Sequence, residues 1–349
     1  MQEMDGGPRA PVLIAHSGSV ANANRLRHAT SRQQFRGETE VGRTAHLIVY
    51  TDGSPAGDAS ARAVLASAEA DYAAVADWFG GIPLPAGQQG DDQTTPRTAT
   101  PVQVLMDAQA GGAYHFGCNA TDLYIEPDPK LATGFMVAEL VEVFEAAAGN
   151  GWDCGHANGE GLSRALAGDR NPALVADLLQ TEQAWWANGH HDYVANNDAD
   201  DRDENSNGCC TLFLYYLHSQ LGHSWQQICT TGGSSLGATY QRLSGRDAST
   251  GFNDFVTLLS SLDQGGQLNL PASGNPFPLS GGATAPAAPA APAVPAPAPA
   301  APDPAVPDAG TVNATSGGGS GGILWTALGA LVVIAIVVGI LFALGIIGH

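Results

Sequence analysis

A long uncharged segment near the C-terminus most constrains what this chain can fold into. Residues 323–347, from Ile323 to Ile347, form 25 consecutive positions without a charged side chain. As an α-helix they would extend about 37 Å at 1.5 Å per residue, enough to cross a hydrocarbon core of roughly 30 Å. The sequence therefore predicts one transmembrane helix and a single-pass membrane protein that contacts lipid through a C-terminal anchor.

The side of the membrane that the main domain occupies is less well determined. No Lys or Arg follows Arg246, so the positive-inside rule gives no orientation. A span so near the end of the chain inserts after translation, which favours the cytosol, whereas a proline-rich spacer before it suits a crowded envelope. We slightly favour the extracytoplasmic side. Within the span, small residues recur every four positions and would permit a homodimer through Ala335, Gly339 and Ala343.

Composition divides the rest of the chain into three parts. Residues 1–43 are polar and lack periodicity, which indicates a partly disordered lead-in. Residues 44–265 carry the hydrophobic patterns of a folded domain. Residues 266–322 form a linker rich in Pro, Ala and Gly, with nine prolines between Pro286 and Pro307, and such a segment favours extended polyproline II structure.

Charge excludes one class of partner. The chain has 14 basic and 34 acidic residues, giving a formal net charge of −20. Phosphate backbones need a positive surface, so we expect no nucleic acid partner. A protein or a cell-envelope component is the more plausible partner for such a domain.

Hydrophobic periodicity within residues 44–265 predicts an α+β fold. Strand patterns occur at 45–50, 102–106 and 122–126, with an Ala-rich helix at 58–78 between the first two. After residue 129 the pattern becomes helical, and helices are expected at 135–148, 160–168, 172–186, 208–221, 224–230, 234–243 and 250–262. A small N-terminal sheet with a helix, followed by a mostly helical half, is the arrangement this order favours.

One helix carries part of a metallopeptidase pattern. In the H-E-x-x-H motif, two His side chains on one helical face bind zinc and the Glu between them activates water. Here the corresponding residues are Ala138-Glu139-Leu140-Val141-Glu142, so both histidines are missing and the would-be general base, Glu139, remains. Eighteen residues after Glu142, Glu160-Gly161 opens another helix, which is how gluzincin-type peptidases present a third ligand.

From about residue 44 to residue 262 the chain resembles the zincin-like, gluzincin-type domains of secreted bacterial peptidases and plant basic secretory proteins. The resemblance extends to the segment Gly208–Leu217 and to a closing region with Tyr240, Leu243 and Phe255. It implies Glu139 as base and Glu160 as third ligand. Because the two zinc-ligand histidines are missing, we expect a degenerate, non-catalytic domain with a binding or scaffold role.

Other interpretations of the same residues remain open. Glu139, Glu142 and Glu145 would also form the solvated stripe of an otherwise buried helix. Alternatively, Glu142, Glu160 and His156 hold a divalent cation such as calcium or manganese, with Glu139 as the base of a metal-assisted hydrolase. A purely structural surface protein is the third class. We expect no cofactor apart from such a cation.

Three further features are open to two interpretations each. His115 either faces the metal-type helix or is a histidine satisfied by hydrogen bonds at a domain edge. The run Gly233-Ser-Ser235-Leu-Gly237 matches a hydrolase pattern, but a helix N-cap at Ser234 or Ser235 is favoured. Five cysteines leave the redox state open, and a bridge from Cys154 to Cys209 or Cys210 is expected if the domain is exported.

Overall fold

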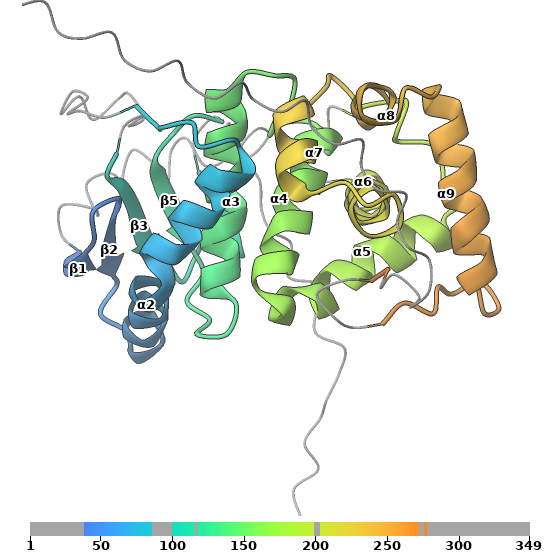
Figure 1. The fold of residues 1–349 in the computed structure, drawn as a ribbon. Coiled ribbons are helices and arrows are strands. Elements are labelled where there is room, and N and C mark those ends of the chain that lie inside the picture. Colours follow the sequence, from blue (N-terminus) through green and yellow to red (C-terminus); the bar gives the residue numbers. More distant parts are fainter. Residues whose placement is uncertain (1–37, 86–99, 116–117, 199–202, 272–275, 278–349) are drawn as a thin grey trace, which may run out of the picture. The chain divides into compact units, whose positions relative to one another are not determined.

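Figure 1 shows the fold in a computed structural model, which describes residues 38–85, 100–115, 118–198, 203–271 and 276–277. Most of the expected lead-in, nearly all of the linker and the apolar segment 323–347 with Ala335, Gly339 and Ala343 lie outside these residues. Among the described residues, none of the helices combines the length and the hydropathy that a membrane span requires.

The N-terminal part of the domain is a five-stranded mixed sheet. The strands are β1 (Thr39–Arg43), β2 (Leu47–Thr51), β3 (Val102–Met106), β4 (Ala113–Tyr114) and β5 (Asp122–Ile125). Their order is β1-β2-β3-β5-β4, with β2, β3 and β5 parallel and each edge strand antiparallel to its neighbour. The parallel strands are almost wholly buried, which explains why their sequences are runs of apolar residues without alternation.

Two long helices pack beside this sheet. Helix α2 (Pro55–Trp78) connects β2 to β3, and it begins where Ser54 Oγ accepts a hydrogen bond from the Gly57 amide with Pro55 at the first helical position. Helix α3 (Ala132–Ala148) contacts α2 and β5 and ends at Gly149, whose left-handed backbone stops the helix.

The remaining elements are helical. They are α4 (Ala157–Arg170), a 3₁₀ turn (Pro172–Leu174), α5 (Val175–Ala187), α6 (Glu204–Tyr215) with a π-helical turn (Tyr216–Gln220), α7 (Trp225–Thr231), α8 (Leu236–Ser244) and α9 (Ala248–Leu262). Helix α4 packs between α3 and α6, and α5 packs against α6. Figure 1 shows α4 as the element that follows α3 on the side away from the sheet.

The α+β class, with a small N-terminal sheet and a mostly helical remainder, is confirmed. The expected strands and helices all correspond to observed elements, with boundaries that differ by a few residues. Ser235 is the N-cap of α8, where its Oγ accepts a hydrogen bond from the Ala238 amide, so its structural interpretation is confirmed.

Two expected boundaries differ from the structure. Strand β1 lies within the segment expected to be a disordered lead-in. None of its five residues is buried, so this edge strand gives little hydrophobic signal in the sequence. At the other end, the fold continues past residue 265. Leu268 and Phe277 are buried in the core, and Leu268 exchanges two hydrogen bonds with the side chain of Gln183 on α5.

Candidate functional site

Three glutamates of α3 are completely buried. Glu139, Glu142 and Glu145 each have 0% exposed surface. Their three-residue spacing places them along one side of the helix, in successive turns. The interpretation of these residues as a solvated stripe is therefore wrong, because no carboxyl group among the three reaches water at the domain surface.

Glycines bring α4 close to this row of carboxyl groups. A Cβ atom on Gly159 would lie 2.5 Å from Glu145 Oε2, and one on Gly161 would lie 2.6 Å from the Cβ of Cys210 on α6. Any larger residue at these two positions would force the helices apart. The glycines that flank Glu160 thus allow α4 to fit between α3 and α6, which places Glu160 in the buried interior.

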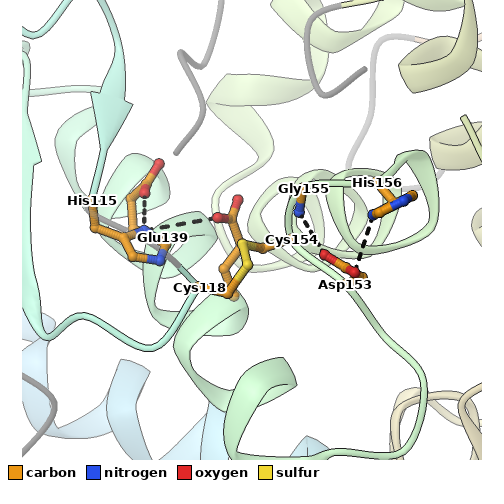
Figure 2. Close-up of a disulfide and its surroundings, with 8 residues drawn as sticks. His115, Cys118, Glu139, Asp153, Cys154, Gly155 and His156 are labelled. Atoms are coloured by element: carbon orange, nitrogen blue, oxygen red, sulfur yellow. Dashed lines mark hydrogen bonds and ion pairs between the residues drawn. A yellow bond between two sulfur atoms is a disulfide. The ribbon is translucent and has the colours of Figure 1, made fainter. Parts of the chain in front are cut away.

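His115 faces the row from the segment that follows β4. Its Nδ1 lies 2.6 Å from Glu139 Oε2 and 3.8 Å from Glu142 Oε2, and all three side chains have no exposed surface. Figure 2 shows the imidazole turned toward Glu139. The expectation that His115 faces the metal-type helix is confirmed, whereas its placement at a domain edge is not.

Helix α4 contributes the positive charge of the cluster. Arg164 is only 2% exposed, and its Nε lies 3.7 Å from Glu160 Oε2 one turn earlier in the same helix. If Glu139, Glu142, Glu145 and Glu160 were all ionised, they would carry four negative charges against the single positive charge of Arg164. Ions without compensation in a protein interior cost several kcal/mol each, so the cluster needs protons or a cation.

Burial dominates the protonation of these groups. Desolvation raises the pKa of Glu139 well above its usual value, although the charge of Arg164 acts in the opposite direction. Burial and then the neighbouring Glu139 raise the pKa of Glu142, and burial and Glu142 raise the pKa of Glu145. Burial also lowers the pKa of His115. Without a cation both shifts favour the neutral forms of His115 and Glu139, which share one hydrogen bond between Nδ1 and Oε2.

Several oxygen atoms in the cluster have no protein partner. Glu139 Oε1 and both carboxyl oxygens of Glu145 make no hydrogen bond to any described residue, although they are buried. Leaving such an atom unpaired costs about 1–3 kcal/mol. Carboxylate oxygens and an imidazole that converge in a buried place are the donors that divalent cations require, so the residues present fit a metal ion.

His156 lies apart from His115 and pairs with Asp153, so its role as a metal ligand stays a prediction. It precedes α4 in an extended backbone conformation, and 37% of its side chain is exposed. Its Nδ1 lies 3.1 Å from Asp153 Oδ2. Figure 2 shows His156 and Asp153 on the opposite side of Cys154 from His115.

The cysteine pairing also differs from the expected one. A disulfide joins Cys118 to Cys154, and Cys209, Cys210 and Cys229 are buried free thiols. The expected bridge from Cys154 to Cys209 or Cys210 is therefore wrong. Both of those residues are buried on α6, where the Cβ of Cys210 faces Gly161.

The sulfur of Cys154 lies at the edge of the acidic cluster. One donor atom each from His115, Glu142 and Cys154 lie within 4.8 Å of one another, and all three residues are buried. Sequence reasoning did not connect Cys154 or Arg164 with the glutamates. The only signal in the sequence is that His115 and Cys118 are three residues apart.

No protein-family model, curated protein or solved structure matches this chain. The resemblance to zincin-like domains therefore stays a prediction that rests on the motifs themselves.

Proposed function

We propose that this chain is a membrane-anchored binding protein whose zincin-like domain holds a divalent cation as a structural ion. The observation that supports this proposal is the buried cluster between α3 and α4. The carboxyl groups of Glu139 and Glu142 lie 2.6 and 3.8 Å from the His115 imidazole there, and Glu160 is paired with Arg164 on α4, all of them buried. A divalent cation would replace the protons that otherwise keep this cluster neutral.

The donor types favour one group of cations. Calcium takes oxygen ligands, whereas an imidazole suits transition metals, and carboxylates suit manganese. His115, Glu139 and Glu142 together offer nitrogen and oxygen donors. Manganese is therefore the cation that we propose, with Glu160 held nearby on α4.

A binding role fits these residues better than hydrolysis. The proposed base, Glu139, has no exposed surface and is bonded to His115 at 2.6 Å. A general base must reach the proton of a water molecule or a substrate. Glu139 is instead hydrogen-bonded to His115 in the interior of the domain. We accordingly propose that the ion fixes α3, α4 and the segment that carries His115, and that binding of a protein or envelope partner involves the domain surface.

The disulfide supports placement outside the cytosol. Disulfides persist in oxidising compartments and are rare in the cytosol. With Cys118 bonded to Cys154, the extracytoplasmic side is the one that we propose for the domain. The apolar segment 323–347 would hold it at the membrane through the proline-rich linker.

A metal-assisted hydrolase is the second candidate. Glu139 and Glu160, the positions that correspond to the base and the third ligand of gluzincins, both lie in the buried contact between α3 and α4. In this case Glu139 would leave His115 to activate a water molecule, and Glu139→Gln would abolish turnover of a peptide substrate while the fold is retained.

Elemental analysis of the full-length protein tests the first proposal. The protein would be purified in detergent without chelators, and its metal content measured by inductively coupled plasma mass spectrometry. We expect about one equivalent of manganese, which Glu142→Gln strongly reduces. Asp254→Asn removes an exposed carboxylate paired with Arg246 and should leave the metal content unchanged. A folded wild-type protein that neither contains nor takes up a divalent metal would refute the proposal.

A further inference from the structure

The structure contains a second, latent donor set beside the acidic cluster. We propose that reduction of the Cys118–Cys154 disulfide creates a zinc site from Cys154 Sγ, the His115 imidazole and the Glu142 carboxylate. The proposal deepens the metal centre described above, because it shares His115 and Glu142 with it. It assigns that centre a change of preferred metal that depends on the redox state of one disulfide.

The distances fit a metal site with small adjustments. With zinc bond lengths of about 2.0–2.3 Å, donors of a tetrahedral site are about 3.3–3.8 Å apart. His115 Nδ1 and Glu142 Oε2 are 3.8 Å apart, and one ring nitrogen of His115, one carboxylate oxygen of Glu142 and the sulfur lie within 4.8 Å of one another. The sulfur therefore has to approach by about 1 Å or less to complete the set.

The chemistry of sulfur explains the change of metal. A disulfide sulfur is a poor ligand, so the oxidised protein offers nitrogen and oxygen donors only. A thiolate selects softer ions, and one sulfur, one nitrogen and one oxygen donor suit zinc better than manganese. Zinc sites with three protein ligands keep a fourth position for water or for another group.

The loop that carries Cys154 is held by contacts that do not depend on the disulfide. Trp152 Nε1 donates to the Cys229 carbonyl at 2.9 Å, and Asn158 Nδ2 donates to the Gly151 carbonyl at 2.9 Å. Asn150 Nδ2 also donates to the Cys229 carbonyl. These bonds connect the loop to α4 and to the end of α7, so Cys154 stays beside His115 after its bond to Cys118 is broken.

The redox step is balanced by a dithiol reductant. Two electrons and two protons pass from the dithiol to the protein disulfide, which yields the thiols of Cys118 and Cys154 and a disulfide in the reductant. The Cys154 thiol then releases its proton to solvent as the sulfur binds zinc. No other reactant is needed.

Two single-cysteine variants of the full-length protein test the proposal. Cys118→Ser and Cys154→Ser both lack the disulfide and both retain Cys209, Cys210 and Cys229, so they differ in which sulfur remains. With zinc alone as the probe and a chromophoric chelator as competitor, we expect Cys118→Ser to bind one zinc at least about tenfold more tightly than Cys154→Ser. Wild-type protein should match Cys118→Ser after treatment with dithiol and should bind zinc at least about tenfold less tightly before it.

Cobalt gives a readout of the sulfur bond itself. Bound to Cys118→Ser or to reduced wild-type protein, cobalt should show thiolate-to-metal charge-transfer absorption that Cys154→Ser lacks. If the serine variants fail to fold, reduction of folded wild-type protein provides the same comparison. Equal zinc affinity of the two variants, or of the oxidised and reduced wild type, would overturn the proposal.

The two metal proposals can fail separately. Absence of manganese from the oxidised protein, together with tight zinc binding by Cys118→Ser, would refute the structural manganese ion and support the zinc site. Manganese in the oxidised protein, with no gain of zinc affinity on reduction, would support the structural manganese ion and refute the zinc site.

Discussion

His115 Nδ1 and Glu139 Oε2 lie 2.6 Å apart, in a place where neither side chain has any exposed surface, although 24 positions separate the two residues in the sequence. Because burial raises the pKa of Glu139 and lowers that of His115, both shifts favour the neutral form of the cation-free pair. The tautomer of His115 then decides whether Nδ1 or the carboxyl group donates the hydrogen bond. This assignment has direct consequences for substitutions at position 139.

Glu139→Gln should cost less than about 1 kcal/mol of unfolding free energy in the cation-free protein, because the amide can either donate to His115 Nδ1 or accept from it. Glu139→Ala should cost about 2–5 kcal/mol, since it leaves Nδ1 buried without a partner and opens a cavity. Denaturant titration in the presence of a chelator measures both. If the Gln variant were as unstable as the Ala variant, the pair would have to be ionised.

Cation binding should release protons. Glu139, Glu142 and Glu145 all have raised pKa values because they are buried, so a metal ion must displace protons from the groups that bind it. Calorimetric titration of manganese at one pH in buffers of different ionisation enthalpy would give the number of protons released, and we expect about one or two. Identical heats in all buffers would show that the ligands are already ionised.

The stability of the domain should fall as the pH rises from about 5 to about 8. Burial raises the pKa of Glu182 on α5 to about 8, from an ordinary 4.5. Between these values the native state retains a proton that the unfolded state has lost, so each increase in pH favours unfolding, and the effect ends above pH 8. The variant Glu182→Gln has no ionisable group at this position.

Relative to this variant, the wild-type protein should lose several kcal/mol of unfolding free energy between pH 5 and pH 8, as measured by denaturation at pH 5, 6.5 and 8. A constant difference between the two proteins would contradict the raised pKa.

Gly159→Ala should destabilise the domain by about 1–3 kcal/mol, even though Ala favours helices. Its methyl group would collide with the Asp153 carbonyl and with Glu145 Oε2. Gly155→Ala, in the turn before α4, is a control for the added methyl group, because the nearest atom to this group would be Asp153 Oδ1 at 3.5 Å. That variant should change stability by less than about 0.5 kcal/mol. Thermal unfolding of both variants compares them, and equal melting temperatures would mean that α4 can move away from α3.

The sequence predicted the class of the fold because its periodic patterns are strong. The buried strands β2, β3 and β5 are short apolar runs, and α3 is long and almost wholly apolar apart from its glutamates. Edge strands β1 and β4 were not predicted. Their residues are partly exposed and few in number, so they carry little hydrophobic signal of their own.

The candidate site was predicted only in part. The spacing of Glu139, Glu142 and Glu160 indicated a metal-type arrangement, and all three are buried at the contact of α3 and α4. Their full burial could not be predicted, since three evenly spaced glutamates are also the pattern of a solvated face. The contribution of Cys154 depends on a loop that hydrogen bonds to α7, which is distant in the sequence.

The bond between Cys118 and Cys154 closes a covalent ring that contains β5 and all of α3, and its two cysteines are 36 positions apart in the sequence. A single peptide-bond cut inside this ring cannot separate the two parts of the polypeptide. A nicked molecule would keep one apparent mass in non-reducing electrophoresis and divide into two fragments after reduction. The helix that carries the buried glutamates therefore belongs to a segment that a single cut cannot release, for as long as the surroundings remain oxidising.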